Sequence, residues 1–301
     1  MKLKTVQPVY IKMVLFTFNP SKIYNPLSED LWMDLHENPN AVPLLEQYPE
    51  QINWRRLSRN PEAMYLLEKN VDKIDWCTLS GNPNAIHLLE QNLDKVDWDR
   101  LSINPNAIHI LEQHLNKVDW DSLSMNPNAI HLLEQHLDKV DWGHLSMNSN
   151  AVHLLEQHLD KVDWIILCTN PNAISILEKH LDKVNWIWLS ENPNAIHLLE
   201  QNLDKVDWWR LSGNPNAIHI LEQHLNKVNW NWLSKNPKAI HLLEQNLDKV
   251  NWEILTMNTQ DVSILEKHPD RFKVRWTLIN PNALHLACDL DYARMKERRQ
   301  P

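Results

Sequence analysis

The sequence contains very little glycine, with 3 residues among 301. Close approach of the backbone to a phosphate usually requires residues without a Cβ, and no glycine-rich phosphate-binding motif of the Walker or dinucleotide type occurs. Cysteine is equally scarce. Cys77, Cys168 and Cys288 are odd in number and lack metal-ligand spacing, which argues against a disulfide framework and against a zinc site. We therefore expect no metal, no cofactor and a reducing compartment.

Long hydrophobic runs are also missing. The apolar run near the start, Met13 to Phe18, is far shorter than a membrane span and is preceded by Lys12, which argues against a signal peptide as well. The composition of 43% apolar and 23% charged residues is typical of a folded soluble chain. The sequence therefore predicts a protein that neither enters a membrane nor is secreted.

Tryptophan, by contrast, recurs at a fixed spacing. Eleven tryptophans, each 22 residues after the last, stand at positions 32, 54, 76, 98, 120, 142, 164, 186, 208, 230 and 252. The first asparagine of an Asn-Pro-Asn-Ala string keeps the same step from Asn38 to Asn280 in twelve copies. Such a period is the signature of a repeat architecture.

Each repeat contains two predicted helix starts. Asn104 before Pro105 is a strong N-cap signal, and the apolar residues between 107 and 118 cover an arc of about 160° on a helix of three turns. Asp119 then caps a shorter helix that begins at Trp120. Two such helices cannot bury their own apolar faces, so the repeats must stack.

We therefore predict an all-α fold, an α-solenoid of about twelve 22-residue two-helix repeats. Residues 1–31 are expected to form an N-terminal cap with a degenerate partial repeat, and residues 32–279 the solenoid. Residues 280–301 are expected to form a C-terminal capping helix and a basic tail.

The repeat resembles those of a known group of proteins. The string L-S-G-N-P-N-A-I-H-L-L-E-Q-N-L-D-K-V-D-W from Leu79 to Trp98, and the ending Leu290 to Arg298, are similar to 22-residue repeat proteins of large DNA viruses that infect algae and amoebae. The resemblance implies a viral protein in the host cytoplasm or in the virion. It implies no reaction, because members of that family carry no assigned activity.

The aligned copies separate constant positions from variable ones. On the short helix, Trp, the Leu three residues later and the Ser four residues later share one face, whereas the positions one, two and five after Trp lie on the opposite face and differ in almost every copy. We call these three positions the variable strip. A contiguous variable surface on a constant framework is typical of solenoids that recognise a partner.

The composition of the variable strip favours a partner surface, since clustered Ile and Trp are unfavourable in solvent and Trp and Arg are common interface anchors. Packing of these side chains between repeats, and drift at solvated positions, are the alternatives. The strip is mixed in its first half and apolar in its second. The candidate partner-binding residues are Arg55, Arg56, Arg100, Ile165, Ile166, Ile187, Trp188, Trp209, Arg210, Trp232 and Ile254.

Histidine is abundant but repetitive. Fourteen of the 16 histidines fall in two repeat columns, five residues apart within a helix, which diverge by about 140° and cannot chelate one metal together. The column that alternates between Asn and His, including Asn92 and His114, is expected to form a hydrogen-bond ladder between repeats. The acidic column before Trp alternates between Asp and Asn, which fits helix capping and not acid catalysis. No catalytic residues are predicted, and the protein is expected not to be an enzyme.

The function predicted on these grounds is a protein–protein interaction scaffold for a viral or host protein. A virion structural or minor capsid component is the alternative. A nucleic-acid-binding repeat protein is a third interpretation, which the net charge of −9 and the acidic columns oppose.

Overall fold

The computed structural model of the protein describes residues 29–284 and residue 286. The predictions for residues 1–28 and 287–301, which cover most of the expected N-terminal cap and C-terminal tail, lie outside this range. Within the described residues the fold is entirely helical, which confirms the predicted all-α repeat solenoid. The chain divides into two compact units. Unit 1 joins the residues up to Asp75 to those from Asn251 onward, and unit 2 comprises Trp76–Val250.

One helix of each repeat begins at the periodic tryptophan, and we call these the Trp helices. The Asp or Asn before Trp caps the helix at Asn53 and from Asp97 to Asn251, as predicted: the Asp97 carboxylate, for example, accepts the Arg100 N–H at 3.0 Å. The Trp helices are α4 (Trp54–Arg59), α6 (Trp76–Ser80), α8 (Trp98–Ile103), α10 (Trp120–Met125), α12 (Trp142–Met147), α14 (Trp164–Leu167), α16 (Trp186–Leu189), α18 (Trp208–Gly213), α20 (Trp230–Leu233) and α22 (Trp252–Asn258), and the equivalent elements of the end repeats are α2 (Glu29–Leu35) and α24 (Val274–Ile279).

The second helix of each repeat follows the Asn-Pro string and is shorter than predicted. In place of one helix over 107–118, the chain forms a turn at 105–106, a helix at Ile108–Gln113 and another turn at 114–117. The helix ends early because His114 leaves the helical region, with φ −133° and ψ 43°. The members of this set are α3 (Val42–Gln47), α5 (Met64–Glu68), α7 (Ile86–Glu90), α9 (Ile108–Gln113), α11 (Ile130–Gln135), α13 (Val152–Gln157), α15 (Ile174–Lys179), α17 (Ile196–Glu200), α19 (Ile218–Gln223), α21 (Ile240–Glu244) and α23 (Ser263–Lys267).

Short 3-10 helices accompany these elements. They are η2 (Pro39–Ala41), η3 (Pro49–Gln51), η4 (Pro61–Ala63), η5 (Val71–Lys73) and η6 (Leu225–Lys227).

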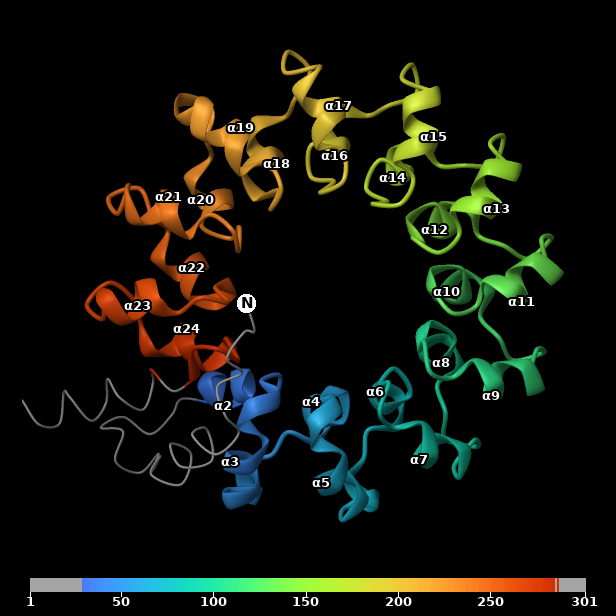
Figure 1. The fold of residues 1–301 in the computed structure, drawn as a ribbon. Coiled ribbons are helices and arrows are strands. Elements are labelled where there is room, and N and C mark those ends of the chain that lie inside the picture. The colour runs from blue at the N-terminus through green and yellow to red at the C-terminus, as the bar shows by residue number, and fades with distance from the viewer. Residues whose placement is uncertain (1–28, 285, 287–301) are drawn as a thin grey trace, which may run out of the picture. The chain divides into compact units, whose positions relative to one another are not determined.

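The repeats of unit 2 stack side by side into an arc. Their Trp helices lie along the concave side and their Asn-Pro helices along the convex side (Figure 1). Between the two rows, Leu101, Ala107 and Leu111 and their equivalents in the other repeats are completely buried. The tryptophans of unit 2 that begin the helices are only half-buried, so small and aliphatic side chains, and not Trp, fill the centre of the core.

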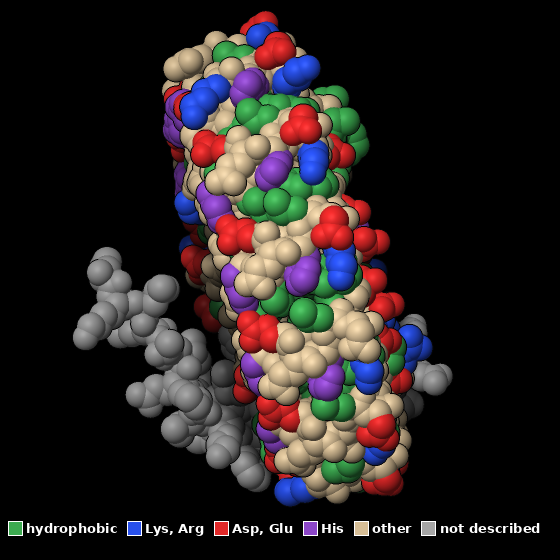
Figure 2. Space-filling view, turned by 90° about the vertical axis from the view of Figure 1, so that its right-hand side faces the viewer, with side chains coloured by type: hydrophobic (Ala, Val, Ile, Leu, Met, Phe, Trp, Pro, Cys, Tyr) green, Lys and Arg blue, Asp and Glu red, His purple; other side chains and the backbone are tan. Residues whose placement is uncertain are grey.

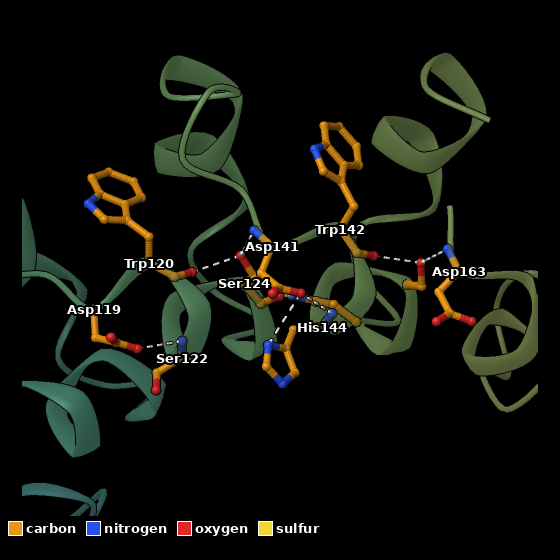
Figure 3. Close-up of polar contacts among 10 residues, drawn as sticks. Asp119, Trp120, Ser122, Ser124, Asp141, Trp142, His144 and Asp163 are labelled. Atoms are coloured by element: carbon orange, nitrogen blue, oxygen red, sulfur yellow. Dashed lines mark hydrogen bonds and ion pairs between the residues drawn. The ribbon is translucent and has the colours of Figure 1, made fainter. Parts of the chain in front are cut away.

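A buried serine joins most repeats of unit 2 to the next. The Ser124 hydroxyl donates to the Trp120 carbonyl at 2.8 Å and accepts the Asp141 N–H, which begins the next Trp helix, at 3.0 Å (Figure 3). The constant Ser four residues after Trp is therefore a two-way hydrogen-bond relay. Neither of its bonds is evident from sequence spacing alone.

The buried asparagine of each Asn-Pro string forms a second link. Asn126 Oδ1 accepts the Asn128 N–H at 3.0 Å, the predicted capping role, although it caps a turn and not the helix itself. Its Nδ2 donates to the Ser102 carbonyl at 2.9 Å and to the Asn104 carbonyl at 3.0 Å in the preceding repeat. We call this series of bonds the asparagine ladder. It satisfies buried carbonyls that would otherwise destabilise the stack.

In unit 1 the first and last repeats pack together. Helices α2 and α24 are in contact, and Asn38 Nδ2 donates to the Leu278 carbonyl at 2.8 Å. Asn40 Nδ2 donates to the Pro281 carbonyl at 3.0 Å. These bonds repeat the pattern of the asparagine ladder. The first and last repeats therefore pack in the same register as consecutive repeats elsewhere in the chain.

One repeat of unit 1 departs from the periodic pattern. Asn258, counted in the sequence as a copy of the ladder asparagine, is exposed and donates to the Ile254 carbonyl at 2.7 Å. Asn280 bonds the Thr259 carbonyl at 2.9 Å in its place. Because α22 runs one residue longer than its counterparts of six residues, the buried position moves by one.

Candidate protein-interaction surface

The variable strip lies on the Trp helices, and its three positions differ in environment. The residue directly after each Trp, which we call the first-position column, points into solvent. Ile165 and Ile187 are each 51% exposed and Trp209 is 59% exposed. These three occupy successive Trp helices, α14, α16 and α18, along the concave side of unit 2 (Figure 1). Side chains that stay more than half exposed lie outside the buried core of the repeat.

The second position after Trp points back toward the fifth position of the preceding repeat. Arg56 Nη1 lies 2.9 Å from Glu37 Oε1, and Arg210 Nη1 lies 2.7 Å from Glu191 Oε2. In both pairs the residues are 19 apart. The two arginines therefore bind carboxylates of their own chain.

The aromatic residues at the second position also pack against neighbouring repeats. The Trp232 ring packs on Gly213, where an added Cβ would stand 2.8 Å from the ring carbon Cε3. The Trp188 ring lies under the Arg210 guanidinium, with 3.8 Å between the guanidinium carbon and the ring centroid, and remains 37% exposed. Packing between repeats, one of the alternatives considered for the strip, thus accounts for much of the second position.

A signal for this pairing was present in the sequence. Three pairs of positions 19 apart on the Trp helices are complementary in size or charge: Glu37 with Arg56, Glu191 with Arg210 and Gly213 with Trp232. The variation in these two columns is therefore partly covariation. It leaves the exposed apolar residues of the first-position column, Ile165, Ile187 and Trp209, as the variable residues outside these pairs.

The remaining predicted residues divide between these environments. Arg55 is exposed in the first-position column, while Arg100, Ile166 and Ile254 are half-buried in the second position. The structure therefore brings Ile165, Ile187, Trp188 and Trp209 together on unit 2. Arg55, Arg56 and Ile254 belong to unit 1.

The histidines of the Asn-Pro helices pair with glutamates of the preceding repeat. In five pairs the histidine Nε2 lies between 2.5 and 2.8 Å from a glutamate Oε1, and His197 and Glu178 form a sixth pair. These side chains recur on the outer face of unit 2 (Figure 2). Among the described residues no group of three or more His, Cys, Asp or Glu is placed to hold a metal ion.

The prediction that the alternating Asn and His column forms a hydrogen-bond ladder between repeats is wrong. Asn92 Nδ2 donates to the Leu88 carbonyl of its own helix at 2.9 Å. His136 packs against the Trp120 ring with 4.8 Å between ring centroids, and Lys139 lies 4.7 Å above the same ring. Asn and His can therefore replace one another in this column because each contacts groups within its own repeat. The hydrogen bonds between repeats are made by the buried asparagines of the asparagine ladder.

The described cysteines do not form a reactive site. Cys168 takes the place of the relay serine, with Sγ 3.1 Å from the Trp164 carbonyl and 3.3 Å from the Asn185 nitrogen, and burial raises the pKa of its thiol. The exposed Cys77 donates to the Asp97 carboxylate at 3.0 Å, and this bond raises the pKa of the Cys77 thiol. A raised pKa lowers the thiolate fraction and hence the nucleophilicity at neutral pH.

His36 is a buried residue whose role the sequence prediction missed. It stands four residues after Trp32, in the relay-serine column: its Nδ1 lies 2.6 Å from the Trp32 carbonyl, and its Nε2 accepts the Asn53 N–H at 2.8 Å. Burial lowers the pKa of the His36 imidazole. Its position in the repeat was the available signal.

Comparison with known proteins identifies no relative. The chain matches no protein-family model, no curated protein and no solved structure. No described helix has the length and apolar character needed to cross a bilayer.

Proposed function

We propose that the protein is a non-enzymatic scaffold that binds another protein through the first-position column of unit 2. The observation that carries the proposal is the run of Ile165, Ile187 and Trp209, large apolar side chains that stay more than half exposed on three successive repeats. The framework around them is nearly identical from repeat to repeat, so these residues are not needed to build it. Exposed apolar clusters of this kind are characteristic of interaction sites.

A comparative capture experiment tests the proposal. A variant with Ile165→Ser, Ile187→Ser and Trp209→Ala is compared with the unmodified chain by affinity purification and quantitative mass spectrometry. We expect a partner captured by the unmodified chain to fall by about tenfold or more with the variant, because aromatic anchors dominate interface energies. The variant should keep its helical circular dichroism, with a melting temperature within about 2 °C of the parent.

The outer face provides a matched control. Leu181 and Leu225 are also large and apolar, with 47% and 42% exposure, and they belong to the connections after the Asn-Pro helices. Leu181→Ser with Leu225→Ser should leave the captured partners unchanged. Equal loss in both variants, or an unchanged partner list in the triple variant, would show that the first-position column is not the recognition surface.

The viral setting is a proposal that rests on the resemblance of the repeat sequence alone. If it is correct, the partner is a viral or host protein. Stoichiometric presence of the chain in purified particles would favour a virion component, and its absence there would favour a role in the infected cell.

A further inference from the structure

The first-position column of unit 2 continues beyond its apolar run. On α8 and α10 the same position is occupied by Asp99 and Asp121, both exposed. Neither carboxylate forms a salt bridge with another described residue, unlike Glu191, which is paired with Arg210. The column therefore carries two unpaired negative charges, then Gly143 on α12, then the apolar run on α14, α16 and α18.

The carboxylates that cap the Trp helices strengthen the acidic end. Asp97 and Asp119 directly precede α8 and α10, each two residues before a first-position aspartate. One oxygen of each cap accepts a backbone N–H, at 3.0 Å and 2.8 Å respectively. The nearest cation in this part of the strip is the half-buried Arg100, which interacts with Asp97. The local charge is thus negative, which opposes phosphate-bearing ligands such as RNA or an anionic membrane.

The spacing of the column restricts the shape of a ligand. Packed helices lie about 8–10 Å apart, so the five steps from α8 to α18 cover about 45 Å. An α-helix of about 30 residues has this length, and its residues seven apart recur every 10.5 Å or so, about one per repeat. A helix with a basic cluster followed by apolar side chains at this spacing would match both the charge and the surface of the column.

We propose that the first-position column of unit 2 binds an amphipathic helical segment of another protein, whose basic residues face Asp99 and Asp121 and whose apolar residues face Ile165, Ile187 and Trp209. This inference rests on the proposed function and names the chemistry of its partner. Apolar contact would supply most of the affinity, and the aspartates would orient the segment and raise its association rate.

A displayed-peptide selection tests the inference. A library of helical peptides of about 30 residues, with positions on one face randomised, is panned against the full chain and counter-selected against the Ile165→Ser, Ile187→Ser and Trp209→Ala variant. We expect the retained clones to carry Lys or Arg clustered at one end and apolar residues at the other.

Binding measurements on the best clone then locate the charge contribution. Asp99→Asn with Asp121→Asn should weaken binding by about three- to tenfold and flatten its salt dependence, because it removes two attractive charges. Asp138→Asn with Asp160→Asn, two exposed aspartates in the connections of the outer face, should have no effect. Bulk RNA and anionic vesicles should not compete for the column.

The outcomes separate the two proposals. Retained clones without basic residues, no effect of the Asp99 and Asp121 substitutions, or competition by RNA or vesicles would overturn the inference and leave the apolar surface as a protein-binding site. If no clone distinguishes the unmodified chain from the triple variant, the inference fails, and the capture experiment decides the proposed function separately.

Discussion

At the scale of single residues, one hydrogen-bond relay is made by chemically different side chains. A serine hydroxyl, the Cys168 thiol and the His36 imidazole each donate to a Trp carbonyl and accept an N–H from the start of the next Trp helix. Neutral imidazole can do this because one ring nitrogen donates and the other accepts. Protonated imidazole cannot, since both nitrogens then donate.

His36 therefore makes stability depend on pH. Burial lowers the pKa of His36 in the folded state. Below about pH 6.5, His36 is therefore protonated in the unfolded chain while it stays neutral in the folded chain. The contribution of neutral His36 is complete above that pH and is lost as the pH falls toward the lowered folded-state pKa. We expect the free energy of unfolding to decrease from pH 7.5 to 5.5 more in the unmodified chain than in His36→Ser, as measured by urea titration.

Ser58→Ala is the control for this prediction. It removes the same relay, in which Ser58 Oγ contacts the Trp54 carbonyl at 2.7 Å and the Asp75 nitrogen at 3.2 Å, without removing a titratable group. It should cost about 1–3 kcal/mol at every pH in this range. Parallel pH profiles for the unmodified chain and His36→Ser would contradict the assignment.

At the scale of helices and turns, two sets of capping residues that look alike in the sequence tolerate substitution to different degrees. Asp119 caps α10 through its carboxylate alone, whereas Asn126 also uses its amide to bond the Ser102 and Asn104 carbonyls. Asp119→Asn should change stability by less than about 0.5 kcal/mol. Asn126→Asp should cost about 3 kcal/mol or more, because it places a buried carboxylate against two carbonyls. Thermal melts of the two variants make the comparison, and equal melting temperatures would refute the ladder.

The contact between successive Trp helices gives a second prediction at this scale. Gly213→Ala should destabilise the chain by about 1–3 kcal/mol, because the new Cβ would stand 2.8 Å from the Trp232 ring. Gly81→Ala should be neutral or slightly stabilising, since the atom nearest to the new Cβ would be the Thr78 carbonyl oxygen at 3.8 Å. Adding Trp232→Ala should relieve the Gly213→Ala penalty in a double-mutant cycle; independent effects would mean that the ring does not pack there.

At the scale of the molecule, unit 1 depends on a contact between the beginning and the end of the described chain. Asn38 bonds the Leu278 carbonyl across a sequence separation of 240 residues. Asn38→Asp should weaken the packing of α2 on α24, for the same reason that Asn126→Asp weakens the ladder. The terminal helices would then separate or pair with those of another copy.

Spin labels test this contact directly. With the native cysteines replaced by serine, labels at the exposed positions Glu46 and Glu266 should give a narrow distance distribution in the parent and a broader, longer one in Asn38→Asp. Light scattering would show whether copies associate. An unchanged distribution would mean that the end repeats do not depend on this bond.

The repeat boundaries, the all-α class and the capping aspartates were predictable because they are local. A 22-residue period, an Asp or Asn before Trp and a buried Leu three residues later need no knowledge of distant contacts. The same is true of the conclusion that the histidine columns are part of the framework, since both columns repeat with the period. The helix expected over 107–118 was too long because apolar periodicity cannot distinguish a helix from a helix followed by a compact turn.

The 22-residue period and the variable strip could be recognised from the order of the amino acids. Which variable residues are exposed could be seen only once the repeats were stacked, because their exposure depends on neighbours 19 residues away in an adjacent repeat. Arg210 and Trp232 are engaged by Glu191 and Gly213, whereas Ile165 and Trp209 have no counterpart and stay exposed. The same holds for the buried asparagines, whose second set of bonds, and whose link from Asn38 to Leu278, exist only after the repeats have stacked.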